Sequence, residues 1–161
     1  MARYIVDSQI DNHEKYYFIR EQESQDIVLL PSKYLMHKKR SKLSPNTIRR
    51  SAGAISYYLN YIDETGIQLD DVWEMPYDKQ QEHFTDYLIW LQAGLHSGDS
   101  YKKKPYNETC NAYLKEVFRF YRFSGQQDES IKQLKVLSDM RIIVHNSVGV
   151  KRTLYRNTFH I

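Results

Sequence analysis

The stretch from Leu43 to Gly66 has the clearest pattern of apolar and polar positions in the chain. Its apolar residues recur at spacings of four, three, four and three, which places them on one face of a helix. They are Ile48, Ala52, Ile55, Leu59 and Ile62. Ser44 is suited to cap the start of this helix, Pro45 to occupy its first position, and Gly66 to take a left-handed conformation at its end. The pattern therefore predicts one long amphipathic helix from Pro45 to just before Gly66.

Two further segments show helical spacing. Residues 78–93 are expected to form a helix that Asp78 and Gln81 begin as a capping box and Gly94 ends. Its buried stripe is Phe84, Tyr87, Leu88 and Leu91. Residues 107–123 are expected to form a helix capped by Asn107, with Gly125 beyond its end. Its inward residues are Cys110, Leu114, Val117 and Tyr121.

The remaining segments have weaker patterns. The runs 16–20 and 27–30 are rich in aromatic and branched residues, and the polar link 21–26 between them predicts a β-hairpin packed on the helices. Residues 31–40 are expected to form a short helix that buries Tyr34 and Leu35, and residues 129–140 another. The last twenty residues are basic and extended in pattern.

These elements predict a mainly α fold, a small four- to five-helix bundle with a short N-terminal β-hairpin. A chain of 161 residues suits one domain with a small appendage. We therefore expect a hairpin appendage at residues 1–30, a helical domain at 31–140, and a basic extended tail or linker at 141–161.

Charge is unevenly distributed, although the whole chain carries only +3. Residues 37–62 contain six basic and no acidic side chains, whereas residues 63–93 contain one basic and eight acidic ones, a net −7. Such a polarised surface steers charged partners. The alternative is that the two blocks pair with each other inside the molecule.

Cations also cluster locally, before the first long helix and along the third. Asn111, Lys115, Arg119 and Arg122 are spaced by four, four and three residues, so they share one helix face. Such a row is able to contact both base edges and phosphates, and the alternative is a solvated helix face. Three consecutive lysines, residues 102–104, precede this helix.

No pattern in the sequence predicts catalysis, a metal site or a cofactor. The six histidines are dispersed, Cys110 is the one cysteine, and the six glycines form no phosphate-binding loop. No apolar run is long enough to span a membrane, and the N-terminus does not resemble a signal peptide. We therefore expect a cytoplasmic protein without a small-molecule substrate.

The three long helices, in this order, resemble the N-terminal core-binding domain of the tyrosine recombinase or phage integrase family. The similarity lies in S-P-N-T-I-R-R-S-A-G-A-I-S-Y-Y-L-N-Y-I at 44–62, H-F-T-D-Y-L-I-W-L at 83–91 and N-E-T-C-N-A-Y-L-K-E-V-F-R-F-Y-R-F-S-G at 107–125. The resemblance implies a SAM-like helical bundle that forms half of a C-shaped clamp over DNA. It also implies a separate C-terminal catalytic domain with an H-x-x-R box and a nucleophilic tyrosine, which this chain lacks. His37–Arg40 matches H-x-x-R formally, but it precedes the binding domain and is interpreted as a basic patch.

The expected function is therefore double-stranded DNA binding, as part of a site-specific recombinase that would act in DNA integration with further recombinase subunits on the DNA. The chain alone is expected to bind without cutting, while the full-length protein would break and rejoin DNA. The alternative is a helical protein–protein interaction module.

The candidate DNA-binding residues fall into three groups by expected role. Phosphates are expected at Lys38, Lys39, Arg40, Lys42, Lys102, Lys103 and Lys104. The positive end of the first long helix offers Ser44, Asn46 and Thr47 to a phosphate. The groove is expected to be contacted by Arg49, Arg50, Asn111, Lys115, Arg119 and Arg122.

Overall fold

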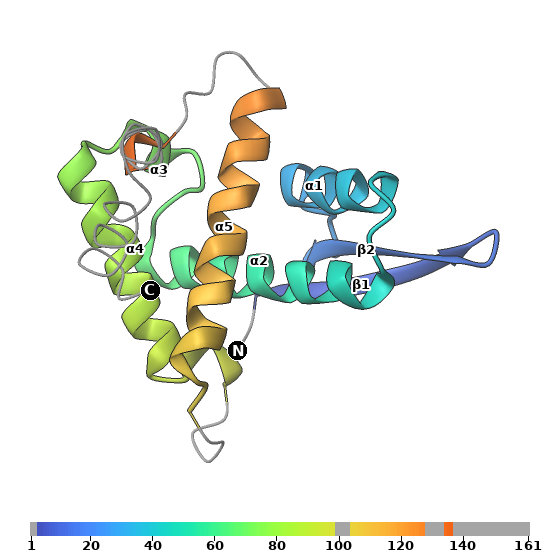
Figure 1. The fold of residues 1–161 in the computed structure, drawn as a ribbon, viewed down its shortest axis with the longest axis horizontal. Coiled ribbons are helices and arrows are strands. Elements are labelled where there is room, and N and C mark those ends of the chain that lie inside the picture. Colours follow the sequence, from blue (N-terminus) through green and yellow to red (C-terminus); the bar gives the residue numbers. More distant parts are fainter. Residues whose placement is uncertain (1–2, 99–103, 128–133, 137–161) are drawn as a thin grey trace, which may run out of the picture. The chain divides into compact units, whose positions relative to one another are not determined.

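Helices make up most of the secondary structure, and one two-stranded hairpin precedes them (Figure 1). The structure is a computed structural model that describes residues 3–98, 104–127 and 134–136. The predicted fold class, mainly α with a short N-terminal β-hairpin, is confirmed. The chain divides at Gly66 into two compact units, residues 1–66 and 67–161, and this boundary lies inside the range 31–140 expected to be one domain.

The hairpin lies earlier in the chain than the sequence pattern indicates. Strands β1 (Tyr4–Asp11) and β2 (Glu14–Glu21) pair antiparallel, with Tyr4 opposite Glu21 and Asp11 opposite Glu14. Asn12 and His13 form the two-residue turn, with φ of 50° and 66°. The predicted second strand at 27–30 was wrong: Ile27 forms only an isolated bridge with Arg20, because the chain enters a helix two residues later.

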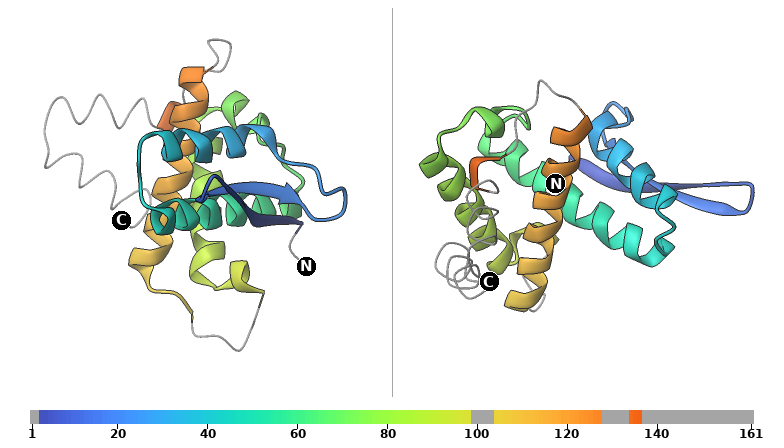
Figure 2. Two further views of the ribbon diagram at one scale, coloured as in Figure 1. Left: turned by 90° about the vertical axis from the view of Figure 1, so that its right-hand side faces the viewer. Right: turned by 45° about the horizontal axis from the view of Figure 1, so that its top comes forward.

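Helices α1 (Leu29–Arg40) and α2 (Pro45–Thr65) pack against this hairpin in the first unit (Figure 2). The start of β1 is tied to α2 by Asn60, whose Oδ1 accepts the N–H groups of Arg3 at 3.0 Å and Tyr4 at 2.9 Å. Its amide also donates to the carbonyl of Tyr4 at 3.2 Å. This one side chain satisfies three backbone groups at a strand end, so it fixes where the hairpin sits on the helix.

The ends of α2 confirm the sequence prediction. The Ser44 hydroxyl accepts the N–H of Thr47 at 3.2 Å, Pro45 is the first helical residue, and Gly66 ends the helix in the left-handed conformation with φ of 75°. All five residues of the predicted stripe are buried. Burial extends beyond that stripe to Ala54, Tyr58 and Tyr61, so more of the helix surface is covered than the periodicity indicates.

The second unit contains α3 (Asp71–Glu74), α4 (Tyr77–Gln92), the 3₁₀ turn η1 (Leu95–Ser97) and α5 (Asn107–Gln127). Aromatic rings of α3, α4 and α5 meet edge to face in its core. The ring centroids of Trp73 and Tyr121 are 4.8 Å apart, and those of Phe84 and Phe118 are 4.9 Å apart. Edge-to-face pairs at these distances stabilise a core beyond the area they bury.

Two predicted helix boundaries in this unit were wrong. The start of α4 has no side-chain cap, because Pro76 precedes the helix and its carbonyl accepts the N–H of Gln80 at 2.9 Å, which leaves Asp78 inside the first turn. Helix α5 continues through Gly125 to Gln127. Ser124 is fully buried there and donates to the carbonyl of Phe120 at 3.0 Å, so packing of the last turn outweighs the cost of a helical glycine.

Gln80 of α4 is a buried polar node in the second unit. Its Nε2 donates to the carbonyl of Val72 at 2.8 Å, and its Oε1 accepts the N–H of Lys135 at 2.9 Å. The Lys135 ammonium donates to the carbonyls of Trp73 at 3.4 Å and Met75 at 2.5 Å. The carbonyls at the end of α3 therefore find partners on segments far along the chain. Most of the predicted helix 129–140 and the tail 141–161 lie outside the described residues.

Candidate nucleic-acid interface

Nine of the sixteen predicted site residues lie in one segment of the first unit, from the last turn of α1 to the first turn of α2. We call this segment, residues 38–50, the α1–α2 segment. Helix α1 ends with a left-handed Lys42, φ 62°, whose N–H donates to the carbonyl of Lys39 at 3.0 Å. The N–H of Leu43 donates to the carbonyl of Lys38 at 3.5 Å. These two bonds are those of a Schellman motif, which turns the chain sharply so that α2 begins directly after the cations.

The cations of the α1–α2 segment face different surroundings. Arg40, Lys42, Arg49 and Arg50 are exposed. The ammonium of Lys38 lies 5.1 Å from the centre of the Tyr34 ring. The cations in the last turn of α1 also stabilise the negative end of that helix, so part of their role is structural.

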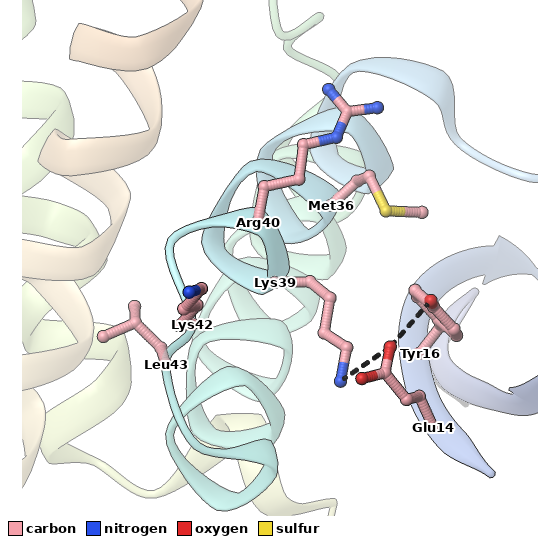
Figure 3. Close-up of a pocket in the computed structure, with 7 residues that line it drawn as sticks. All are labelled: Glu14, Tyr16, Met36, Lys39, Arg40, Lys42 and Leu43. Carbon is pink, nitrogen blue, oxygen red and sulfur yellow. Dashed lines mark hydrogen bonds and ion pairs between the residues drawn. The ribbon is translucent and has the colours of Figure 1, made fainter. Parts of the chain in front are cut away.

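Lys39 is directed toward the hairpin and not toward open solvent (Figure 3). Its Nζ lies 3.9 Å from a carboxylate oxygen of Glu14 and 5.2 Å from the centre of the Tyr16 ring, and its side chain is 19% exposed. The Tyr16 hydroxyl donates to the same Glu14 oxygen at 3.1 Å, and this bond raises the pKa of Tyr16. Lys39 is therefore partly neutralised, and it is less available to a phosphate than Arg40 or Lys42.

The first turn of α2 presents hydroxyl, amide and guanidinium groups. The Ser44 and Thr47 hydroxyls are 2.8 Å apart, and the Asn46 Oδ1 accepts from Nη2 of Arg49 at 2.8 Å. No acidic residue lies in this turn. Arg49 and Arg50 lie in the following turn, so the partial positive charge of the helix end and these two exposed guanidinium groups each favour an anion near the start of α2.

A groove in the first unit runs beside these cations (Figure 3). Its volume is about 480 Å³. Three apolar or aromatic side chains, one carboxylate and three cations line it. They are Tyr16, Met36, Leu43, Glu14, Lys39, Arg40 and Lys42.

In the second unit, α5 carries the predicted row of one amide and three cations. Arg119 and Arg122 are exposed, whereas Asn111 and Lys115 are half-buried. A carboxylate oxygen of Glu116 lies 3.1 Å from Nη1 of Arg119, and the Glu116 side chain is only 8% exposed. This ion pair reduces the net charge of the row. Lys104 is exposed, while Lys102 and Lys103 lie outside the described residues.

Two acidic partners of these cations were not predicted from the sequence. Glu14 is distant in sequence from Lys39, and only the packing of β2 against α1 brings the two together, so no local signal reveals the pair. Glu116 precedes Arg119 by three residues, a spacing at which helix side chains meet, so this pair was visible in the sequence.

Within the described residues, no group of three or more His, Cys, Asp or Glu side chains is placed to hold a metal ion. None of the helices described is long and apolar enough to cross a membrane. Cys110 is buried, and burial raises the pKa of its thiol. No protein-family model, curated protein or solved structure matches the chain.

Proposed function

We propose that the chain binds double-stranded DNA, as the N-terminal core-binding domain of a site-specific tyrosine recombinase. One observation supports this most strongly: Arg40, Lys42, Arg49 and Arg50 are all exposed within eleven residues of the first unit. No acidic residue occurs anywhere in the sequence between positions 37 and 62. A concentration of exposed cations of this kind is the electrostatic footprint of a phosphate-binding surface.

The α1–α2 segment offers the two kinds of contact that duplex binding needs. Arg40 and Lys42 are exposed on the turn between the helices, where they are suited to phosphates. Arg49 is held by Asn46 at 2.8 Å and lies one turn into α2, with a planar guanidinium that suits either a phosphate or a guanine edge. On α5, Arg119 and Arg122 supply a second set of exposed cations.

The experiment that tests DNA binding is a fluorescence anisotropy titration of a labelled duplex. If about five cations neutralise phosphates, log K falls with log salt with a slope of about −4 to −5. Changing Arg40, Arg49 and Arg50 together to Glu should abolish measurable binding at moderate salt, and the same is expected for Lys115, Arg119 and Arg122 together.

Matched controls are two exposed lysines outside the candidate interface. Lys33→Glu changes α1 on its first turns, and Lys79→Glu changes α4. Both should leave the affinity within about twofold of the original, since single distant charges act only weakly at physiological salt. Binding that does not respond to salt, or that falls equally in the controls, would remove the DNA-binding proposal.

The recombinase assignment has its own test. It is supported by the ordered motifs at 44–62, 83–91 and 107–125. We expect the gene to encode, downstream of residue 161, an H-x-x-R box followed by a tyrosine that breaks and rejoins DNA. A gene without such a region would remove the recombinase assignment and leave DNA binding standing.

A protein-interaction module remains the second candidate, and one observation favours it. The groove beside the cations exposes Met36 and Leu43, two apolar side chains that make no favourable contact with a phosphate backbone. Aliphatic side chains next to cations suit a protein surface that is partly apolar and partly acidic.

A further inference from the structure

The groove of the first unit is lined by both apolar and cationic side chains. Its apolar and aromatic lining residues are Tyr16, Met36, which is 38% exposed, and Leu43, which is 40% exposed. Its lining cations Arg40 and Lys42 are both exposed. Lys39 and Glu14 partly compensate each other at 3.9 Å, and with Arg40 and Lys42 the net charge of the lining is positive. Its complement is a surface that presents carboxylates next to an aliphatic side chain.

The acidic block of the sequence, which DNA binding does not use, contains such a surface. On α4, Glu82, Asp86 and Ile89 follow one another at spacings of four and three, so they lie along one helix face. All three are exposed, and Ile89 is 55% exposed although it is a large aliphatic residue. Glu82 is also 3.4 Å from the ammonium of Lys79 in an exposed ion pair, so Asp86 carries the larger share of the stripe's negative charge. We call these three residues the α4 stripe. From Glu82 to Ile89 it spans seven residues, or about 10 Å of helix.

We propose that the groove of the first unit binds the α4 stripe of a second copy of this chain. Ile89 of one copy would rest on Met36 and Leu43 of the other, while Glu82 and Asp86 would pair with Arg40 and Lys42. The contact joins two different surfaces, so the association is heterologous, and it either closes into a ring or extends.

Charge complementarity favours a second copy of the chain over an unrelated acidic partner. The chain itself supplies both halves, a block of +6 at residues 37–62 and a block of −7 at residues 63–93. A groove of about 480 Å³ admits one side chain and its neighbours, so the interface is small and the association weak and transient. Because Arg40 and Lys42 also belong to the proposed DNA surface, duplex DNA and a second copy should exclude each other.

Sedimentation velocity on the full chain at high concentration tests the proposal. The unmodified chain should self-associate at low salt, and raising the ionic strength tenfold should weaken association by at least about tenfold, as expected for contacts between opposite charges. Ile89→Ser should weaken association at every salt concentration. Lys33→Glu and Glu23→Lys, which reverse exposed charges elsewhere, are the matched controls and should not change it.

A charge swap makes the test specific. The variant Arg40→Glu/Lys42→Glu and the variant Glu82→Lys/Asp86→Lys should each be monomeric, and the two should associate when they are mixed. The chain that carries all four changes should regain self-association. Circular dichroism of each variant checks that the fold is kept.

Two results would overturn the proposal: an unmodified chain that stays monomeric at low salt, or self-association that the reversed variants retain. The proposed function is tested separately by the variant Glu82→Lys/Asp86→Lys, which leaves the DNA surface unchanged. If that variant still binds duplex DNA while the unmodified chain is monomeric, the α4 contact fails and DNA binding stands. If the unmodified chain self-associates as expected and no chain binds DNA, the α4 contact stands and the DNA-binding proposal fails.

Discussion

Lys42 occupies the left-handed position that ends α1, with φ of 62°, where glycine is the usual residue. A side chain with a β-carbon is strained in this conformation by about 1 kcal/mol. The chain nevertheless places a lysine there, among the residues that line the groove and between the cations of α1 and those of α2. Residues in strained backbone conformations cluster at functional sites, so the strained and positively charged Lys42 is a candidate for anion binding.

The Lys42 position allows charge and backbone strain to be separated. We expect Lys42→Gly to be more stable than Lys42→Ala by about 0.5–1 kcal/mol, since both lose the ammonium but only glycine relieves the strain. Urea unfolding followed by circular dichroism measures the difference. DNA affinity should fall by the same factor in both variants. A glycine variant no more stable than the alanine variant would contradict the strain at this position.

His83 is a buried titratable group in the second unit, 6% exposed, with its ring edge-on to Phe84 at 4.9 Å. Burial disfavours the charged form and lowers the pKa of His83 to about 4. The His83 side chain takes up a proton near pH 6.5 in the unfolded chain, but only near pH 4 in the folded chain. Above pH 6.5 it is neutral in both states, so it does not reduce the free energy of unfolding. As the pH falls from 6.5 toward 4, only the unfolded chain gains the proton, and the free energy of unfolding decreases progressively.

We therefore expect the second unit to lose about 3 kcal/mol of its unfolding free energy between pH 7 and pH 4 through His83 alone. Both tryptophans of the chain, Trp73 and Trp90, lie in this unit, so tryptophan fluorescence during urea unfolding reports on it. His83→Gln, which does not titrate, should flatten the decline. An equally steep decline in that variant would show that other groups cause it.

At the scale of single elements, local signals decided which predictions were correct. The limits of α2 were readable because its start and end are set by Ser44, Pro45 and Gly66, whose preferences are local. The hairpin was misplaced because its turn is formed by Asn12 and His13, a pair that is not one of the usual two-residue hairpin signals such as Asn-Gly or Asp-Gly. The strand β1 alternates only partly, so its pattern did not compensate for the missing turn signal.

Long-range contacts explain the remaining errors. Gly125 is a helix-ending signal by local preference, but Phe123 and Ser124 are buried, and the helix continues through the glycine. Gln80 lies on the buried face of α4, four residues before Phe84, but its bonds go to residues 72 and 135, and no local pattern reveals those partners. For the candidate site, the sequence located the cations, while the hairpin decides that Lys39 pairs with Glu14.

The buried hydrogen bonds of Gln80 are expected to stabilise the second unit. Gln80→Met keeps the size of the side chain but leaves the carbonyl of Val72 and the N–H of Lys135 without its bonds, at 2.8 and 2.9 Å. We expect the second unit to lose about 1–3 kcal/mol, since each of the two hydrogen bonds contributes about 0.5–1.5 kcal/mol, and the Val72 carbonyl keeps the N–H of Met75 as a partner at 3.3 Å. Tryptophan fluorescence in urea measures the loss. Gln92→Met, at the last residue of the same helix, is the control and should change stability much less.

At the scale of the whole molecule, the exposed cations fall into two sets, one in each unit. Arg40, Arg49 and Arg50 belong to the first unit, and Arg119 and Arg122 to the second. From charge and spacing alone, all five were expected to contact DNA, Arg40 at a phosphate and the other four in the groove. Each set stands on its own helices, so the contribution of each to DNA binding is a separate measurement.

The salt dependence of DNA binding supplies that measurement, because the slope of log K against log salt becomes shallower by about 0.9 for each phosphate that the protein no longer neutralises. Changing Arg40, Arg49 and Arg50 to Ala should reduce the slope by about 3 if all three bind phosphates, and changing Arg119 and Arg122 to Ala by about 2. If only the first set changes the slope, the α1–α2 segment alone binds the DNA, and the row on α5 is a solvated helix face.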